Sequence, residues 1–485
     1  MKKLENIEFE EVFKNFEMIN KIPRCSKEEE KISNFLKEWA KERNFEVIQD
    51  EALNIIIKKP ATDDSKSKST LILQGHMDMV CEKNADKEHD FSKDPIELVI
   101  QDDYIYADNT TLGADNGIAV AMFMTILESN NIKHPNLEIL ITTDEESGMT
   151  GVLNLNPSNL KGKTLINLDS EGEGVFTAGC AGGGRLSLKI KKELKDSSFN
   201  NTYKIFVHGL RGGHSGVDID KDKANSNKIL GRILYGIENH IDVQKICGGS
   251  KTNAIPREAE AIIKTEEYKI VNDIIKTLEK EIKNEYQDSD PNILIEIEKV
   301  NYDIKKVFKD ETKKKIIRGI NLIKNGPLKK STEIELVISS NNLGVIREDD
   351  NYIELVCAPR SSVESILRNF RHQIAQLSEV LDVEYVEEDF YPGWEYAKES
   401  YIRDLCKKTY KETFGKEAQI IAIHAGLECG FLSEKINELD AISFGPNMHD
   451  IHTPNEHLSI ESTQRSYRLL CNILENYKKQ IWNIS

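Results

Sequence analysis

One stretch organises the expected fold of this chain: residues 71–80, which read LILQGHMDMV. The apolar run fits a buried strand, and Gly75 ends it where an imidazole and a carboxylate follow, at His76 and Asp78. In an open α/β sheet, ligands gather beyond the carboxyl ends of the strands, so a His-x-Asp pair there can bind a metal while one residue orients the other. Alone, such a pair is more often an accident of the surface, so its meaning depends on its neighbours.

Length and composition are those of a globular protein with more than one domain. The chain has 485 residues, of which 39% are hydrophobic and 30% charged. No apolar run approaches the roughly 18 residues that span a bilayer, and the first residues lack the apolar core of a signal peptide, so we expect a cytoplasmic protein without a membrane partner. The eight cysteines are scattered, without a Cys-x-x-Cys pair, and are expected to be reduced thiols.

The charge of the chain argues against a nucleic-acid partner. The formal net charge is −17, and affinity for phosphate backbones depends on Lys and Arg releasing counterions. Neither a basic patch with interleaved aromatic residues nor a phosphate-binding Gly-x-x-x-x-Gly-Lys motif is found in the sequence. Small molecules are therefore the expected partners.

A second acidic position lies before an apolar helix. Residues 107–117 read ADNTTLGADNG, and the small residues around Asp115 let the backbone turn tightly and aim its carboxylate. An ordinary helix N-cap is the alternative, because Asp favours that position.

Two further strands also end in carboxylates. The strand expected at 137–142 delivers Glu145 and Glu146, directly after Asp144, and the strand at 163–168 presents Asp169. Consecutive carboxylates repel one another unless a cation or a proton relieves them, although a solvated charge run is the common alternative. Histidine and carboxylate groups thus follow the end of a strand or turn several times within the first 170 residues, and this repetition favours a functional site.

The character of the chain changes over residues 182–383, where strands mix with long helices. We expect an inserted α/β domain there and a discontinuous catalytic domain formed by 1–181 and 384–485. Within the insertion, a glycine-rich turn displays His214, and an ordinary glycine-rich hairpin is the alternative. Capping boxes are expected at two helix starts, Ser26 with Glu29 and Ser361 with Glu364.

The candidate ligands, with a late histidine in a Gly/Pro-rich loop, suit a borderline cation. Imidazole with carboxylate fits Zn²⁺, Mn²⁺ or Co²⁺, whereas Ca²⁺ and Mg²⁺ favour oxygen alone. There are too many ligands for one zinc. Two divalent metals about 3.5–4 Å apart would use them, and one unliganded carboxylate would remain to carry a proton.

Six ordered motifs carry a resemblance to a known family. They are GHMD (75–78), GADNG (113–117), TDEE (143–146), NLDSE (167–171), GGHSG (212–216) and HTPNE (452–456). The chain resembles the di-zinc exopeptidase family of carnosinases, peptidase T and aminoacylases, over nearly its whole length. The longer runs at 112–119, 177–183, 250–259 and 424–430 resemble its bacterial aminoacyl-histidine dipeptidase branch. The resemblance implies an α/β catalytic domain, with a mixed, centrally parallel sheet covered by helices, and an inserted lid domain that mediates dimerisation.

The resemblance also implies roles for the acidic and histidine positions. His76 and Asp169 would bind one metal, Glu146 and His452 the other, and Asp115 would bridge both. Asp78 would orient His76 without binding a metal. Glu145 would be the general base. His449 would not be a ligand, because the family's ligand position directly precedes Thr453-Pro454.

Substrate-binding roles follow from the same resemblance. His214 would stabilise the oxyanion and would come from the partner subunit of a homodimer formed through the lid domain. Asn253, Arg360 and the Gly426 backbone would hold the terminal carboxylate of a small peptide substrate. A cis peptide is implied between Asp115 and Asn116.

The implied function is a cytosolic metallo-dipeptidase that acts on unblocked dipeptides, with Xaa-His dipeptides as expected substrates and two zinc ions as expected cofactors. A tripeptidase or an N-acyl-amino-acid deacylase would use the same metal motifs. A catalytically inactive, metal-binding dimeric protein is a third alternative, against which the presence of Glu145 argues.

Overall fold

The computed structural model of the chain describes residues 7–302, 305–332 and 337–478. The chain divides into two compact units. Unit 1 comprises Met1–Gly179, Tyr396–Ala422 and Leu427–Ser485, and unit 2 comprises Cys180–Glu395 and Ile423–Gly426. The role of the inserted region as a lid or dimerisation domain stays a prediction.

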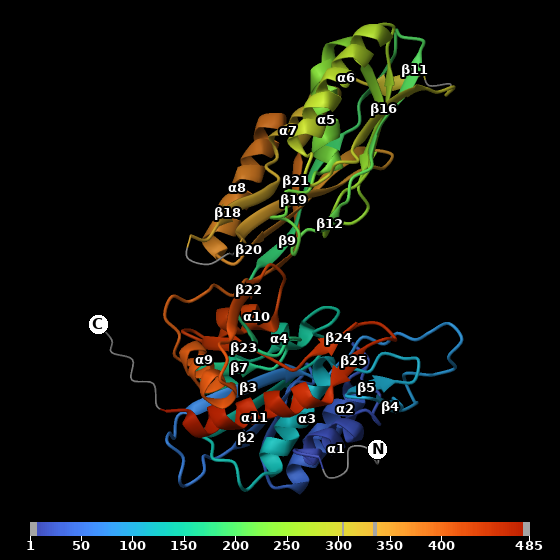
Figure 1. Cartoon of the computed structure of the whole chain (residues 1–485). Helices are drawn as coiled ribbons and strands as arrows, with labels where there is room; N and C mark the ends of the chain where they lie inside the picture. Colours follow the sequence, from blue (N-terminus) through green and yellow to red (C-terminus); the bar gives the residue numbers. More distant parts are fainter. Residues whose placement is uncertain (1–6, 303–304, 333–336, 479–485) are drawn as a thin grey trace. The chain divides into compact units, whose positions relative to one another are not determined.

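An eight-stranded sheet forms the centre of unit 1 (Figure 1). Its strands are, in spatial order, β1 (Glu46–Gln49), β2 (Ile55–Lys59), β6 (Asn136–Thr142), β3 (Thr70–His76), β7 (Thr164–Asn167), β23 (Asp440–Ser443), β8 (Val175–Cys180) and β22 (Gln419–Ile423). The central strands β6, β3, β7 and β23 are parallel, whereas β1, β2 and β8 pair antiparallel with their neighbours. The predicted mixed, centrally parallel sheet is therefore confirmed.

Strand β3 is buried from its second residue to its last, as a central parallel strand covered on both faces must be. His76 at its end aligns with Thr142 of β6, and Gln74 aligns with Asn167 of β7. The carboxyl ends of these strands therefore lie at one edge of the sheet. Gly75 allows a close approach there, because a Cβ at this position would lie 2.3 Å from Oδ1 of Asn116.

Five of the described helices contribute apolar side chains to the core that forms with this sheet: α1 (Glu10–Ile19), α2 (Glu30–Glu42), α3 (Ala114–Glu128), α9 (Tyr401–Phe414) and α11 (Ile460–Asn476). The unit also contains α4 (Thr150–Asn154), α10 (Glu428–Lys435) and a short 3₁₀ turn at Pro157–Asn159. A small second sheet has the order β24 (Met448–His449), β25 (His457–Ser459), β5 (Tyr104–Ala107) and β4 (Leu98–Gln101). The loop between β24 and β25 carries His452.

Unit 2 is built on a nine-stranded sheet. Its strands are β16 (Leu294–Lys299), β11 (Thr202–His208), β15 (Ala259–Lys264), β13 (Asp242–Gly248), β19 (Val337–Glu348), β20 (Tyr352–Ser361), β9 (Gly182–Lys191) and β21 (Glu384–Tyr391) in this order, with β18 (Gly326–Lys330) paired to β19. Packed on it are α5 (Ser226–Ile237), α6 (Tyr268–Glu285), α7 (Asp310–Leu322) and α8 (Glu364–Leu381), and a 3₁₀ turn covers Glu238–His240. Two short ribbons complete the unit, β10 (Leu194–Asp196) with β17 (Lys306–Phe308) and β12 (Gly213–His214) with β14 (Ala254–Ile255).

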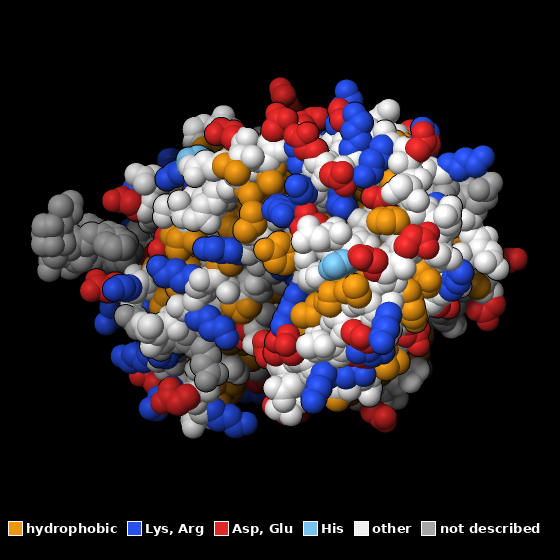
Figure 2. Space-filling view, turned by 90° about the horizontal axis from the view of Figure 1, so that it is seen from above, with side chains coloured by type: hydrophobic (Ala, Val, Ile, Leu, Met, Phe, Trp, Pro, Cys, Tyr) orange, Lys and Arg blue, Asp and Glu red, His pale blue; other side chains and the backbone are white. Residues whose placement is uncertain are grey.

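The surface seen in Figure 2 mixes Lys and Arg with Asp and Glu and with scattered apolar side chains. No helix in the described ranges is both long and apolar enough to cross a membrane.

The expectation of reduced thiols is wrong for one pair, because Cys25 and Cys81 form a disulfide. Their Cα atoms lie 5.7 Å apart although 56 positions separate them. Backbone pairing of Cys25 with Met79 brings the two segments together, and no local spacing in the sequence reveals this pairing.

Both predicted capping boxes are also wrong. Helix α2 begins at Glu30, and the Oγ of Ser26 donates to Oδ2 of Asp78 at 2.8 Å. Helix α8 begins at Glu364 after Val363, and Ser361 bonds to the backbone of Val363 without capping the helix. In both places the serine hydroxyl forms a hydrogen bond outside the helix, to a distant carboxylate at Ser26 and within a turn at Ser361.

Candidate metal centre and active site

The carboxyl ends of β3, β6 and β7 and the start of α3 bring four of the predicted ligands to one place. His76 ends β3 and is 1% exposed, and Asp169 follows β7. Glu146 follows β6, and Asp115 lies in the turn at the start of α3, where its backbone is not helical. The peptide between Asp115 and Asn116 is cis, as the family resemblance predicted.

Asp115 stands between two imidazole rings. Its Oδ1 lies 3.2 Å from Nε2 of His76, and its Oδ2 lies 3.4 Å from Nε2 of His452. Asp169 Oδ1 is 3.3 Å from the same nitrogen of His76, and Glu146 Oε2 is 3.0 Å from Nε2 of His452. The five groups therefore form two sets, each with one imidazole and one further carboxylate, that share Asp115.

His452 reaches this cluster from the far end of the chain. It lies in the loop between β24 and β25, with a φ of 62°, and its side chain is 43% exposed. His449 is in β24, paired with His457 in β25, and its ring packs against Tyr104. The loop thus presents one of its histidines to the carboxylates and keeps the other in an aromatic cluster.

The chemistry of this cluster fits a pair of divalent cations. Ligand atoms of His76, Asp115 and Glu146 all lie within 4.8 Å of one another. Burial raises the pKa of Asp169 to about 6, and the charges of Asp115 and Glu146 act in the same direction. Cations would relieve this crowding of carboxylates, and the imidazole and carboxylate donors are those that borderline metals prefer.

Asp78 contacts the other side of the His76 ring. Its Oδ1 lies 3.2 Å from Nδ1 of His76, in ion-pair contact rather than in an ideal hydrogen bond. The same carboxylate accepts the backbone N–H of Glu145 at 3.1 Å and of Glu146 at 3.3 Å. Asp78 is fully buried, and these contacts hold the imidazole and the backbone of the two acidic residues in place.

Glu145 is a candidate proton carrier. Burial raises the pKa of its carboxyl well above the ordinary value, and the neighbouring charge of Asp169 acts in the same direction, whereas His76 opposes it. A carboxylate whose proton affinity is raised in this way is a better proton acceptor than an ordinary one.

The remaining predicted residues belong to unit 2. Asn253 and Arg360 line one cavity of about 650 Å³, together with Tyr391. The guanidinium of Arg360 donates from Nη1 to the Tyr391 hydroxyl at 3.1 Å and to the His424 carbonyl at 3.2 Å. The other N–H groups of this planar fork suit a carboxylate.

His214 lies beside Asn253, because β12 and β14 pair His214 with Ala254. Its Nδ1 accepts the backbone N–H groups of Gly216 and Val217, each at 3.2 Å. Burial and the charge of Arg360 lower the pKa of this histidine, which favours the neutral ring. A neutral ring here has its proton on Nε2, because Nδ1 accepts the two N–H groups. Gly426 packs on Tyr391, where an added Cβ would lie 2.9 Å from the ring.

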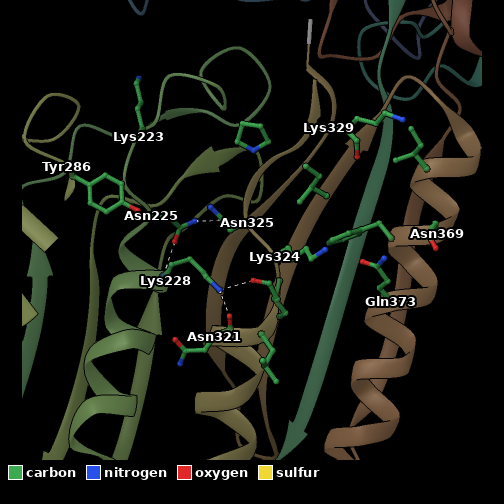
Figure 3. Close-up of a pocket in the computed structure, with 17 residues that line it drawn as sticks. Lys223, Asn225, Lys228, Tyr286, Asn321, Lys324, Asn325, Lys329, Asn369 and Gln373 are labelled. Atoms are coloured by element: carbon green, nitrogen blue, oxygen red, sulfur yellow. Dashed lines mark hydrogen bonds between the residues drawn. The ribbon is translucent and has the colours of Figure 1, made fainter. Parts of the chain in front are cut away.

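A second cavity in unit 2, of about 750 Å³, has a different lining (Figure 3). Lysines and amides line it, and its lining has no His, Asp, Glu or Cys. Lys228 is already satisfied there, because its ammonium donates to the carbonyls of Ile320, Asn321 and Ile323. This cavity therefore does not repeat the combination of imidazole and carboxylate groups found in unit 1.

Sequence reasoning missed a buried cation beside the carboxylates. Arg24 is 2% exposed, and its guanidinium donates to the carbonyls of Met77, Asp78 and Gly113 and to Oδ1 of Asn20. The local sequence around Arg24 contains no signal for this role, because all its partners except Asn20 are distant in the chain.

Residues 72–476 match the family described as Peptidase family M20/M25/M40. The chain belongs to this family. The resemblance recognised in the six motifs is therefore confirmed, and the carboxylate cluster lies in a metallopeptidase of the M20 family.

Two relatives match this M20 peptidase over almost its whole length. It is 36% identical over 467 residues to the cytosol non-specific dipeptidase of Escherichia coli (strain K12), covering 95% of this chain and 96% of that protein. It also matches the crystal structure of aminoacylhistidine dipeptidase from Vibrio alginolyticus, with a TM-score of 0.95, 34% identity and 99% of each chain covered. Aminopeptidase PepT from Bacillus cereus shares the fold, with a TM-score of 0.54 and 17% identity over 96% of this chain and 98% of that one.

Proposed function

We propose that this M20 peptidase is a dipeptidase that hydrolyses unblocked dipeptides, with Xaa-His dipeptides among its substrates, and that it uses two zinc ions. Manganese or cobalt would suit the same ligands. The observation that carries the proposal is the position of Asp115, whose two oxygens face His76 and His452. The similarity to two dipeptidases along nearly the whole chain supports the substrate class.

In this proposal the metal ligands are His76 and Asp169 for one ion, Glu146 and His452 for the other, and Asp115 for both. Two divalent cations bound there would polarise the scissile carbonyl and provide a nucleophile at neutral pH. Asp78 holds the imidazole of His76 in place and, through two backbone N–H groups, the segment that carries Glu145 and Glu146.

Glu145 is proposed as the general base. Its carboxylate takes a proton from the attacking water and delivers this proton to the nitrogen of the leaving amine. The raised pKa of its carboxyl supports this role, because the group must hold the proton between the two transfers.

Unit 2 is proposed to bind the substrate. Arg360 and Asn253 would hold the terminal carboxylate of the dipeptide, with the Gly426 backbone beside them. Nε2–H of His214 would donate to the oxyanion, and in the homodimer that we propose this group comes from His214 of the partner subunit. A cytoplasmic location is proposed from the cytosolic relative.

A substrate panel tests the proposal. Free dipeptides with varied second residues, their N-acylated forms and tripeptides are incubated with protein of measured metal content. We expect hydrolysis of free dipeptides to be fastest, with Xaa-His among the better substrates. If no dipeptide is turned over by metal-loaded protein, the proposal fails. Faster cleavage of N-acyl amino acids or tripeptides would keep the metal chemistry and replace the substrate class.

A further inference from the structure

Glu456 is a buried acidic residue whose carboxylate meets the start of helix α3. Its side chain is 2% exposed. Oε2 accepts the backbone N–H groups of Leu112 at 2.7 Å and Gly113 at 2.9 Å, and Oε1 accepts those of Ala114 at 2.8 Å and Asp115 at 3.4 Å. One carboxylate therefore binds four consecutive peptide groups that end at Asp115.

Two of these N–H groups, those of Ala114 and Asp115, belong to the first turn of α3, and those of Leu112 and Gly113 come directly before it. The first N–H groups of a helix have no intrahelical acceptor, and a carboxylate is favourable there because it meets the positive end of the helix dipole. Hydrogen bonds to an ionised acceptor are also stronger than neutral ones. Glu456 thus fixes the backbone from which the Asp115 side chain projects between two imidazoles.

The same residue closes the loop that carries His452. The backbone N–H of Glu456 donates to the Thr453 carbonyl at 3.0 Å. Strand β25 begins at the next residue, His457, and pairs with β5. The backbone of Glu456 is therefore anchored in the small sheet, whereas its side chain holds the Asp115 turn.

The opposite side of this turn is held by Arg24. Its Nη2 donates to the Gly113 carbonyl at 2.6 Å, while the N–H of Gly113 donates to Glu456. The φ of Gly113 is 66°, and a Cβ there would lie 2.4 Å from Nη2 of Arg24. The turn is thus held on its carbonyl side by a buried cation and on its N–H side by a buried anion.

We propose that Glu456 is a positioning residue that fixes the carboxylate of Asp115 relative to His452 and thereby sets the affinity of the site for its metal pair. This inference rests on the proposed function, because it assumes that Asp115 binds both ions. Among the described residues of the Asp115 turn and of the loop between β24 and β25, Glu456 alone makes four hydrogen bonds from one segment to the other.

Two substitutions separate the effect of the position of the Glu456 carboxylate from the effect of its charge. Glu456→Gln keeps the size but presents an amide N–H₂ to two of the four donors. Glu456→Asp keeps the charge but is one methylene shorter, so it cannot reach all four N–H groups. Glu138→Gln is the matched control, because Glu138 is also 2% exposed in unit 1 and accepts the N–H groups of Lys161 and Gly162.

The experiment measures metal affinity by competition with a chelator, using Zn²⁺ as the probe, and the unfolding temperature of the metal-free protein. We expect both Glu456 variants to lose about 10- to 100-fold in metal affinity, the range for residues that support metal ligands. Excess Zn²⁺ should restore part of their activity. Glu138→Gln should unfold at a lower temperature and bind metal like the wild type.

Equal metal affinity in the wild type and both Glu456 variants would overturn the inference. Wild-type affinity in Glu456→Asp, with a loss in Glu456→Gln, would overturn the positioning role, because the charge alone would then explain the effect. Hydrogen exchange on the metal-free wild type gives a test that needs no variant. The amides of residues 112–115 should exchange slowly, and exchange as fast as that of exposed loops would also overturn the inference. If the wild type itself binds no metal and cleaves no dipeptide, the proposed function fails instead.

Discussion

Oδ1 of Asp78 lies 3.2 Å from Nδ1 of His76, on the side of the ring opposite to the nitrogen that faces Asp115 and Asp169. The imidazole is therefore held between one carboxylate behind it and two in front of it. Asp78 favours a proton on Nδ1, and a ring in this tautomer would offer its Nε2 lone pair to a metal.

Asp78→Asn should weaken the site without removing a ligand. The amide has one acceptor oxygen where the carboxylate has two, so the orientation of His76 and the backbone of Glu145 and Glu146 are less well fixed. We expect a loss of about 10- to 100-fold in metal affinity or activity. Asp440→Asn is the control, because Asp440 is a buried carboxylate that accepts Ser400 Oγ and the Ile402 N–H. That control should reduce stability and leave metal affinity unchanged.

Glu145→Gln and Glu146→Gln should behave differently although the residues are adjacent. Glu145→Gln removes the proposed base but no ligand, so it should keep its metals and lose about 10²- to 10⁴-fold in kcat. Glu146→Gln removes the carboxylate that contacts His452 and should bind less metal. Metal content and kcat are measured on the same preparations. Near-normal turnover by Glu145→Gln would remove the general-base assignment.

Arg360→Lys should raise KM more than it lowers kcat, because the substitution removes the planar fork that we propose holds the substrate carboxylate before and during the reaction alike. Hydrogen bonds to charged groups contribute about 1.5–3 kcal/mol, so we expect roughly a 10- to 100-fold rise in KM. Arg347→Lys is the control, because Arg347 lines the same cavity and its Nε donates to Glu354 at 2.7 Å. An equal rise in both variants would contradict a specific role for Arg360.

His134 should make the stability of the protein depend on pH. Its side chain is fully buried, burial lowers its pKa, and its Nε2 has no hydrogen-bond partner. Below a pH of about 6.5, the usual pKa of histidine, His134 is protonated in the unfolded chain but stays neutral in the folded chain. The free energy of unfolding therefore falls as the pH falls.

Urea unfolding of His134→Gln between about pH 5 and 7.5 measures this effect. The variant should lose less stability on acidification than the wild type, by up to about 1.4 kcal/mol per pH unit. Exposed His372 provides the control substitution, His372→Gln. Parallel pH profiles for the wild type and His134→Gln would contradict the prediction.

Much of the fold could be predicted from local sequence. Buried parallel strands have apolar runs in the sequence, and each run changes abruptly to polar residues where the strand ends. Strands β3, β6 and β7 lie close to their expected positions for this reason. The capping boxes at Ser26 and Ser361 fail for the complementary reason. A hydroxyl has several possible partners, and the sequence does not say which of them packs beside it.

The sequence alone determined the family and the chemical types of the candidate ligands, since the motifs contain them in order and each motif is local. The tertiary structure decided how those motifs come together in space. Only the folded chain brings His452 to Glu146 and Asp115, seats Glu456 on four N–H groups of the Asp115 turn and buries Arg24 against Gly113. Such contacts depend on three-dimensional packing of segments 89 or more positions apart in the chain, which no local pattern of residues encodes.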